Sequence, residues 1–192
     1  MTSIVLASTS PYRRKLLQRL GLPFTSEAPG IEEAAIKQAG GEPAAMASAL
    51  ARHKAQAVAA RHPQAVVIGS DQIASIDGEV LDKPGTAAAA AAQLRRLQGR
   101  EHTLLTAVSL ANAGEVVDFL DVTRLCMRLL TDSEIERYVA ADQPLDCAGS
   151  YRIEGLGISL FAGIDCEDQT AIVGLPLLRL CAELRQLGIA VP

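Results

Sequence analysis

The hydrophobic and polar positions of this chain alternate between strand-like and helix-like patterns. Unbroken apolar runs predict strands covered on both faces, and apolar residues spaced three or four apart predict helices. Strands are expected at 4–7, 65–69, 73–81, 104–110, 116–127 and 158–161. Helices are expected at 11–20, 43–61, 87–98, 131–141 and 176–187. This alternation predicts an α/β fold, a mixed sheet with flanking helices, in which the middle of the chain forms a second lobe.

Turn and cap signals fix several of these boundaries. Ser10 stands at an N-cap position, with Pro11 at the first helical position, where its missing N–H does no harm. Residues 131–134, Thr-Asp-Ser-Glu, form a capping box. Asp77-Gly78 is a strong hairpin signal, so the chain is expected to fold back on itself between 73 and 81.

Composition limits the classes of protein to consider. The chain has 192 residues, 49% of them hydrophobic, which is enough for one ordinary domain or two small lobes with a real core. Its net charge of −4 argues against a non-specific nucleic-acid binder, but it leaves room for a local basic pocket. No apolar run approaches a membrane span and no signal peptide is evident, so no membrane association is expected.

The cysteines and histidines show no metal or disulfide pattern. The chain has no CxxC motif, and its three histidines lack ligand spacing. Reduced thiols in a cytoplasmic protein are the expectation. The cysteines are Cys126, Cys147, Cys166 and Cys181.

Residues 8–14, Ser-Thr-Ser-Pro-Tyr-Arg-Arg, carry the first chemical signal. Arg13, Arg14 and Lys15 crowd the first turn of a helix, where the helix dipole is already positive and cations are disfavoured. A strand, a Ser/Thr-rich turn and a cationic helix start together suit a polyanion such as a triphosphate. The alternative is a solvated basic turn.

The second signal is Gly69-Ser70-Asp71-Gln72, directly after the apolar run 65–69. An acidic residue at the carboxyl end of a buried strand lies where open α/β sheets place their ligands. Asp71 could hold Mg²⁺ or orient a water there. The alternative is a turn aspartate that bonds its own backbone.

Further charged residues support the first signals. Lys54 falls on the apolar i, i+4 stripe of the helix predicted at 43–61, so it either reaches the surface or meets a buried anion. Lys83 adds a cation in a rigid Lys-Pro-Gly turn, and Glu32 and Glu33, in a loop, could share a metal with Asp71. Each could be a solvated surface charge, but together they suit a phosphate ester.

Over essentially its whole length the chain resembles the Maf nucleotide pyrophosphatases. The ordered matches are Ile-Val-Leu-Ala-Ser-Thr-Ser-Pro-Tyr-Arg-Arg at 4–14, His-Lys-Ala at 53–55, Ile-Gly-Ser-Asp-Gln at 68–72, Asp-Lys-Pro at 82–84, Cys-Ala-Gly-Ser-Tyr at 147–151, Glu-Gly-Leu-Gly at 154–157 and Val-Gly-Leu-Pro at 173–176. So many motifs in order are far more specific than a single glycine motif.

The resemblance implies a single Maf-like domain over 1–192, with two lobes around a deep cleft and an ITPase-like fold. It implies hydrolysis of a nucleoside triphosphate to the monophosphate and pyrophosphate with Mg²⁺ or Mn²⁺, usually by a homodimer. The implied roles are phosphate binding by Ser8, Arg13, Lys54 and Lys83, metal binding by Glu33 and Asp71, and general-base catalysis by Asp71.

Three positions resemble the subgroup that acts on 7-methyl-GTP rather than the commoner form that acts on UTP and dTTP. They are Tyr12, Gln72 and Glu154. N7-methylation makes guanine cationic, so an aromatic face and a carboxylate both favour it, whereas arginine at position 12 would repel it. The alternatives are a UTP/dTTP or broad house-cleaning pyrophosphatase, and a nucleotide-binding regulator of cell division.

Overall fold

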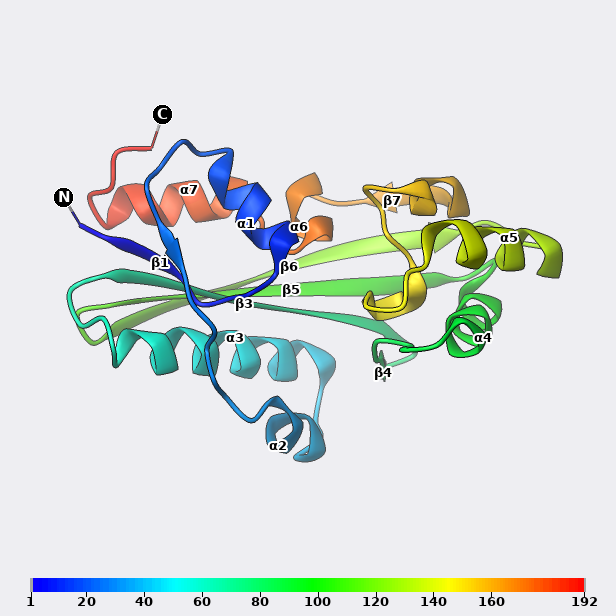
Figure 1. Cartoon of the computed structure of the whole chain (residues 1–192), viewed down its shortest axis with the longest axis horizontal. Coiled ribbons are helices and arrows are strands. Elements are labelled where there is room, and N and C mark those ends of the chain that lie inside the picture. Colours follow the sequence, from blue (N-terminus) through cyan, green and yellow to red (C-terminus); the bar gives the residue numbers. More distant parts are fainter. Residues whose placement is uncertain (1, 192) are drawn as a thin grey trace. The chain divides into compact units, whose positions relative to one another are not determined.

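The computed structural model describes residues 2–191 as a mixed α/β protein with a seven-stranded sheet (Figure 1). The sheet has the order β2-β1-β3-β5-β6-β7, and β4 pairs with β3. The strands are β1 (Ile4–Leu6), β2 (Thr25–Ser26), β3 (Val66–Ile76), β4 (Glu79–Leu81), β5 (Glu101–Asn112), β6 (Glu115–Met127) and β7 (Phe161–Asp165). The helices are α1 (Pro11–Gln18), α2 (Glu33–Gln38), α3 (Pro43–Ala59), α4 (Ala87–Leu97), α5 (Asp132–Asp142), α6 (Gln169–Val173) and α7 (Leu177–Gln186), with 3₁₀ turns η1 (Ala148–Ser150) and η2 (Leu156–Leu160).

The chain divides into two compact units. The first unit comprises residues 2–72, 106–121 and 168–191, and the second comprises residues 73–105 and 122–167. The strands β3, β5 and β6 contribute residues to both units. The second unit is therefore built from the middle of the chain.

The first unit has a three-layer core. β1 pairs in parallel with β2 and β3, and helices lie on both faces of these strands (Figure 1). Because side chains alternate along a strand, Ile4 and Leu6 pack with leucines of α1 and α7, whereas Val5 packs with the small residues of α3. The apolar runs at 4–7 and 65–69 are buried on both faces for this reason.

Helix α1 begins as the sequence predicted. The Ser10 side chain accepts a hydrogen bond from the Arg13 backbone N–H, and Pro11 is the first helical residue. Leu16 and Leu17 are buried, and Gly21 takes a positive φ of 66° just after the helix. The N-cap therefore fixes the residue at which the cationic turn begins.

The strand predicted at 65–69 does not end there. β3 runs from Val66 to Ile76 without a break, so the expectation that Asp71 follows a strand end is wrong. Gly69 is required by packing instead of by a turn, because a Cβ there would collide with Ala51 O and lie 2.6 Å from Ala55 N of α3. The turn comes later, at Asp77-Gly78, where both residues have positive φ and β4 pairs back onto β3.

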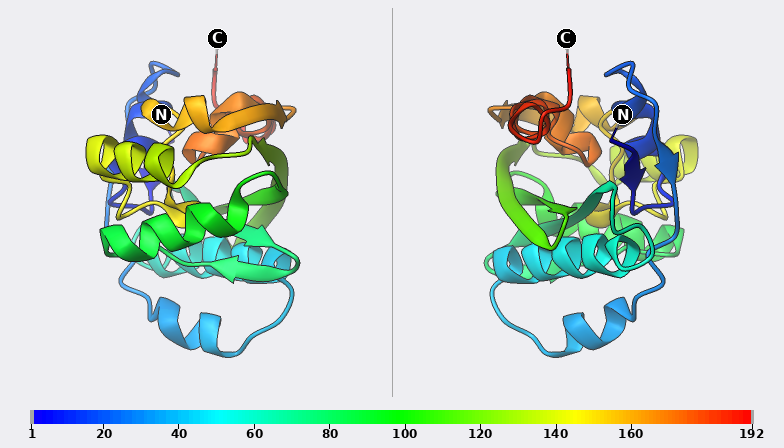
Figure 2. Two further views of the ribbon diagram at one scale, coloured as in Figure 1. Left: turned by 90° about the vertical axis from the view of Figure 1, so that its right-hand side faces the viewer. Right: turned by 90° about the vertical axis from the view of Figure 1, so that its left-hand side faces the viewer.

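Three short elements of the first unit had no sequence prediction, namely β2, α2 and α6. Glu33, expected in a loop, is the first residue of α2, and Glu32 is its N-cap residue. Figures 1 and 2 both place α2 beyond α3, on the side away from the sheet. Each of these elements is six residues or fewer, too short for a hydrophobic period to mark it.

The second unit follows its cap signals closely. Thr86 caps α4, and Thr131 and Glu134 form the predicted capping box at the start of α5. The prediction of a strand at 158–161 is wrong, because residues 156–160 form the 3₁₀ turn η2 and β7 begins only at Phe161. Glycine-rich sequence gave no clear period in that region. No helix within residues 2–191 is long and apolar enough to cross a membrane.

His102 of the second unit is buried in an aromatic cluster. Its Nε2 shares a 3.0 Å hydrogen bond with the Tyr151 hydroxyl, and its ring lies 6.0 Å from the Phe161 ring. Nδ1 has no hydrogen-bond partner among the described residues. Burial therefore lowers the pKa of His102 from 6.5 to about 4.

We predict that this histidine makes stability depend on pH. Between about pH 6.5 and 4 the unfolded chain binds the proton that folded His102 excludes, so stability falls as pH falls through that window. The loss should reach about 3 kcal/mol, from 1.36 kcal/mol per pKa unit. Urea unfolding measures the free energy of unfolding across this window. In His102→Phe its decrease from pH 6.5 to pH 4 should be smaller by about 3 kcal/mol than in the unmodified protein. The control His53→Gln, at an exposed position, should show the same decrease as the unmodified protein. Equal pH profiles for His102→Phe and the unmodified protein would contradict the prediction.

Candidate functional site

Three charged side chains of the first unit meet at one ammonium group. Lys54 Nζ lies 2.6 Å from Asp71 Oδ1 and 2.8 Å from Glu33 Oε1. The lysine and aspartate side chains are 7% and 11% exposed, whereas the glutamate side chain is 45% exposed. We call Lys54, Asp71 and Glu33 the ammonium cluster. It joins α2, α3 and β3.

The helical period of α3 places the lysine inside. Lys54 is buried together with Met46, Leu50 and Val58, which confirms the predicted i, i+4 stripe. A buried ammonium needs an anion, because the cost of removing a charge from water is large. Asp71 supplies that anion directly, so Lys54 does not reach the surface as an exposed lysine would.

Strand β3 carries Asp71 past the end of its parallel neighbour. The last paired residues of β1 and β3 are Leu6 and Ile68, and Asp71 lies three residues further along β3. The chain leaves β1 at this end and enters the Ser8 loop and α1. The carboxylate thus lies beyond the carboxyl end of β1, where α/β sheets bind ligands, although its own strand continues.

Arg13 lies in the field of the same two carboxylates. Burial lowers the pKa of Arg13, and the negative charges of Asp71 and Glu33 oppose that change. Its Nε donates a 3.0 Å hydrogen bond to the Gly174 carbonyl. The structure therefore places a second cation near the carboxylates of the ammonium cluster, and a backbone group orients it.

The Gly174 carbonyl also accepts a 3.0 Å hydrogen bond from Ser70 Oγ. Ser70 precedes Asp71 on β3 and is fully buried, so one carbonyl links the neighbour of Asp71 to Arg13. The sequence pattern had indicated no role for Ser70 or Gly174. The Val-Gly-Leu-Pro motif at 173–176 was the available signal, but its partners lie about a hundred or more residues away in sequence.

Ser8 and Gln72 have defined partners in the first unit. Ser8 is buried in the loop after β1, and its Oγ accepts a 3.1 Å hydrogen bond from the Ser10 N–H. Gln72 Nε2 donates to the carbonyls of Ala171 and Ile172, at 2.8 and 3.1 Å, and lies 2.9 Å from Thr106 Oγ1. The amide nitrogen of Gln72 is therefore directed at α6.

The other predicted site residues lie on different elements. Tyr12 is half-buried in the first turn of α1. Lys83 and Glu154 are exposed residues of the second unit. Lys83 lies between β4 and α4, and Glu154 lies between η1 and η2. The structure brings Lys54, Asp71, Glu33 and Arg13 together within the first unit, and this set is formed without Lys83 or Glu154.

The chemistry of the ammonium cluster can be compared with that of a metal site. Mg²⁺ in enzymes takes one or two carboxylates together with waters and substrate phosphates. Glu33 and Asp71 supply two carboxylates, which fits such a partial set. Within residues 2–191 no group of three or more His, Cys, Asp or Glu side chains could enclose a metal. The donors therefore suit an ion that arrives with a phosphate ligand better than a fully enclosed metal.

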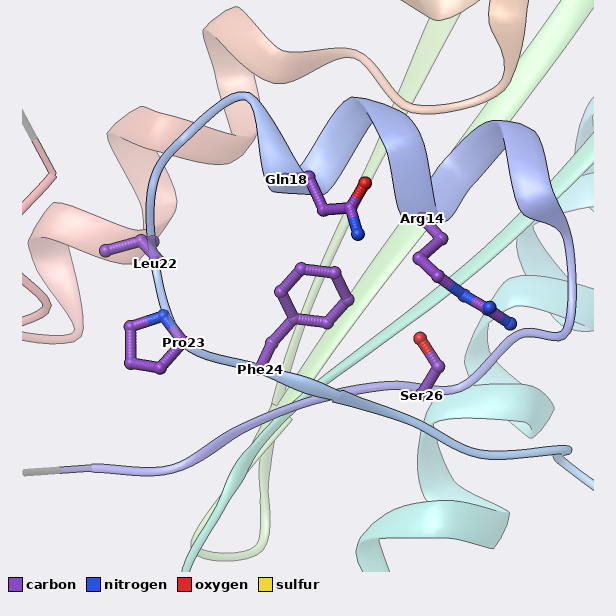
Figure 3. Close-up of a pocket in the computed structure, with 6 residues that line it drawn as sticks. All are labelled: Arg14, Gln18, Leu22, Pro23, Phe24 and Ser26. Carbon is purple, nitrogen blue, oxygen red and sulfur yellow. The ribbon is translucent and has the colours of Figure 1, made fainter.

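A separate pocket of about 470 Å³ lies beside α1 (Figure 3). Figure 3 shows the Arg14 side chain extending from α1 toward Ser26, with the Phe24 ring near Gln18. Of the cationic helix start predicted to suit a polyanion, Arg14 lines this pocket and Arg13 does not. It offers one cation and no carboxylate, so the ammonium cluster is the better candidate for chemistry. The lining residues are Arg14, Gln18, Leu22, Pro23, Phe24 and Ser26.

Comparison with known proteins identifies the family. Residues 3–187 match the family described as Maf-like protein. The chain belongs to the Maf family. A relative from Xanthomonas oryzae pv. oryzae is 52% identical over 192 residues, covering all of both chains, and one from Xanthomonas campestris pv. campestris is 50% identical over 193 residues, again with full coverage. A relative from Polaromonas is 49% identical over 189 residues, covering 97% of this chain and 85% of its own. All three are named 7-methyl-GTP pyrophosphatase.

A solved structure confirms the fold class. The structure of the Staphylococcus aureus Ham1 protein matches with a TM-score of 0.54 and 15% identity, covering 96% of this chain and all of that one. At this identity the likeness concerns the fold alone. The predicted mixed sheet with flanking helices is thus confirmed both by the architecture and by this Maf protein's likeness to Ham1.

We predict that the ammonium cluster is required for stability. Lys54→Met leaves the Asp71 carboxylate buried without its cation, which typically costs about 3–5 kcal/mol. The double variant Lys54→Met/Asp71→Leu removes both charges and should recover most of that loss. Urea unfolding measures both, with the exposed Lys15→Met as a control that changes stability by less than about 0.5 kcal/mol. A Lys54→Met variant as stable as the unmodified protein would show that Asp71 does not depend on this lysine.

Proposed function

We propose that this Maf protein hydrolyses a nucleoside triphosphate, 7-methyl-GTP above others, to the nucleoside monophosphate and pyrophosphate. The observation that carries the proposal is the ammonium cluster, in which Lys54 orients Asp71 and Glu33 near Arg13. It combines a positioned carboxylate with cations, as hydrolysis of a phosphoric anhydride requires. The names of relatives about 50% identical over their full length support the substrate.

In the proposed reaction a water oxygen attacks the α-phosphorus. Asp71 accepts a proton from that water, while the bond between the α-phosphorus and the bridging oxygen breaks and pyrophosphate leaves with the electron pair. Lys54 contacts Oδ1 of Asp71 and fixes the orientation of the carboxylate. General-base assistance of this kind is worth about 10²–10⁴ in rate. No covalent intermediate is required.

The phosphates would be held by Ser8, Arg13, Lys54 and Lys83. Arg13 is the best prepared of these, because its Nε is already bound to the Gly174 carbonyl, and its terminal nitrogens would meet phosphate oxygens. Such fixed cations stabilise charge that develops on the equatorial and leaving oxygens, usually the largest single contribution to catalysis.

We also propose a divalent cation, Mg²⁺ or Mn²⁺, held by Glu33 and Asp71 together with the substrate phosphates. When bound, such an ion neutralises charge on the leaving pyrophosphate. Glu33 is the better placed ligand, because it is half exposed and can leave Lys54 without stranding a buried charge.

Base selection is assigned to Tyr12, Gln72 and Glu154. Tyr12 offers an aromatic face to the cationic methylated base, and the exposed Glu154 offers a carboxylate to its N–H groups. The amide nitrogen of Gln72 is bonded to α6, so its contribution to selection would pass through its carbonyl oxygen or through the position of α6. A homodimer in the cytoplasm completes the proposal, the compartment resting on four free cysteines.

Replacing Asp71 by Asn tests the general base. The change keeps the shape of the side chain and leaves Glu33 as a partner for Lys54, so the fold should persist. Pyrophosphate release with Mg²⁺ should fall at least about a hundredfold in kcat. The control Asp77→Asn, in the exposed hairpin turn, should keep full activity because Asn tolerates the positive φ found there. Near-normal kcat in a folded Asp71→Asn would remove the catalytic role.

A substrate panel tests the specificity. We expect the unmodified protein to have a higher kcat/KM for 7-methyl-GTP than for GTP, UTP or dTTP. Glu154→Gln should lower kcat/KM for 7-methyl-GTP by roughly ten- to a hundredfold, because a charged hydrogen bond is worth about 1.5–3 kcal/mol. Adding Tyr12→Arg should lower it further while activity on UTP holds or rises. The control is Glu101→Gln, an exposed change in the same unit as Glu154.

The panel also separates the alternatives. A preference of the unmodified protein for UTP or dTTP would overturn the specificity and leave the pyrophosphatase activity intact. Binding of a nucleotide without any release of pyrophosphate would instead favour the regulator.

A further inference from the structure

A buried carboxylate of the first unit joins the starts of two helices and takes no part in the proposed chemistry. Asp168 is 5% exposed and is the N-cap residue of α6. Its Oδ1 accepts hydrogen bonds from the Thr170 N–H at 2.8 Å and the Thr170 hydroxyl at 2.6 Å. Its Oδ2 accepts one from the Leu178 N–H of α7 at 2.7 Å.

Thr170 extends the same link. While donating to Asp168, its hydroxyl oxygen accepts a 2.9 Å hydrogen bond from the Leu177 N–H. Asp168 and Thr170 therefore bind the first two N–H groups of α7 to the start of α6. These groups are left unpaired by a helix itself, and both side chains that satisfy them come from outside α7. We call Asp168 and Thr170 the helix clasp.

The clasp closes the loop that contains Gly174. The chain from α6 to α7 passes through Gly174 at a φ of +116°, and a Cβ there would lie 3.3 Å from Arg13 Nε. The Leu175 N–H, which shares a peptide plane with the Gly174 carbonyl, donates to the Thr170 carbonyl at 3.3 Å and so orients that peptide. The Gly174 carbonyl is then directed at Arg13 Nε and Ser70 Oγ, both at 3.0 Å. Its direction depends on how α6 and α7 are joined.

The same short helix binds the residue after Asp71. Gln72 Nε2 donates to the carbonyls of Ala171 and Ile172, and the Thr106 hydroxyl donates to the Ala171 carbonyl at 3.0 Å. The end of α6 thus contacts α1 through Arg13 and β3 through Ser70 and Gln72, on either side of Asp71. A shift of this helix end would move Arg13 relative to Asp71.

We infer that Asp168 and Thr170 are positioning residues, which hold the Gly174 carbonyl where it orients the Arg13 guanidinium for phosphate binding. This inference rests on the proposed function only for the identity of the bound group. With Nε fixed, the guanidinium plane is set, so its other nitrogens present a rigid fork to a planar arrangement of oxygens. An arginine that can rotate would bind the same phosphate with a less favourable entropy.

The test is a double-mutant cycle between Thr170 and Arg13. Thr170→Val keeps the side-chain shape and removes both hydroxyl bonds, and it should lower kcat/KM for the triphosphate by roughly ten- to a hundredfold, mostly through KM. In an Arg13→Lys background the same change should cost less than about twofold, because the oriented group is already gone. Thr170→Ser should restore the activity. The control Thr103→Val removes a hydroxyl that donates to the Ser75 carbonyl in the second unit, and it should leave kcat/KM unchanged.

A second measurement does not depend on activity. Hydrogen exchange at Arg13 Nε–H, followed by NMR, should be slow in the unmodified protein, at least about tenfold faster in Thr170→Val, and slow again in Thr170→Ser. Either of two results would overturn the positioning role. One is unchanged hydrogen exchange in Thr170→Val. The other is that Thr170→Val lowers kcat/KM equally in the unmodified protein and in Arg13→Lys. If no triphosphate is hydrolysed by the unmodified protein, the proposed function fails while the exchange result still decides this inference.

Discussion

The first unit depends on one buried ammonium group. Lys54 lies on the apolar face of α3, where a hydrocarbon side chain would pack without cost, and its charge is accommodated only because Asp71 and Glu33 meet it. A pair of this kind rarely adds net stability over two apolar residues, since desolvation offsets the attraction. It does fix the geometry, because each partner is destabilised without the other. A role in chemistry therefore explains this buried charge cluster better than a contribution to folding stability does.

Two further features follow from that constraint. For α3 to lie close enough to β3, the strand needs Gly69, where any Cβ would collide with the helix backbone. The two carboxylates then leave a negative field, in which Arg13 is held at a helix start that its charge alone would disfavour. Two cations, Lys54 and Arg13, lie near two carboxylates in one small region. An incoming polyphosphate could therefore replace a carboxylate as the partner of a cation that is already in position.

Short irregular segments supply the precision of the site. α6 and the Gly174 turn form no large part of the core, yet their carbonyls accept hydrogen bonds from Arg13, Ser70 and Gln72. Backbone carbonyls are useful here because the backbone of the helix and of the turn fixes their direction, and they carry no rotamer freedom of their own. Gln72, which we propose as a base-selecting residue, would therefore also act on the proposed phosphate region, through the helix end that it holds.

The sequence by itself determined most of the longer elements and placed Lys54 on the apolar face of a helix. Caps at Ser10 and Thr131, together with the hydrophobic period of α3, are local signals, and they act within a few residues. The motifs also indicated the family, which the comparisons confirm. Tertiary structure decided the rest. The turn-like residues 69–72 remained in a strand because α3 packs on Gly69, Glu33 entered a helix, and the Gly174 carbonyl met Arg13 across 161 residues of sequence. Such contacts depend on which backbone groups come close to one another in the folded chain. A local hydrophobic period or charge pattern does not predict them, because it involves only residues that are neighbours in sequence.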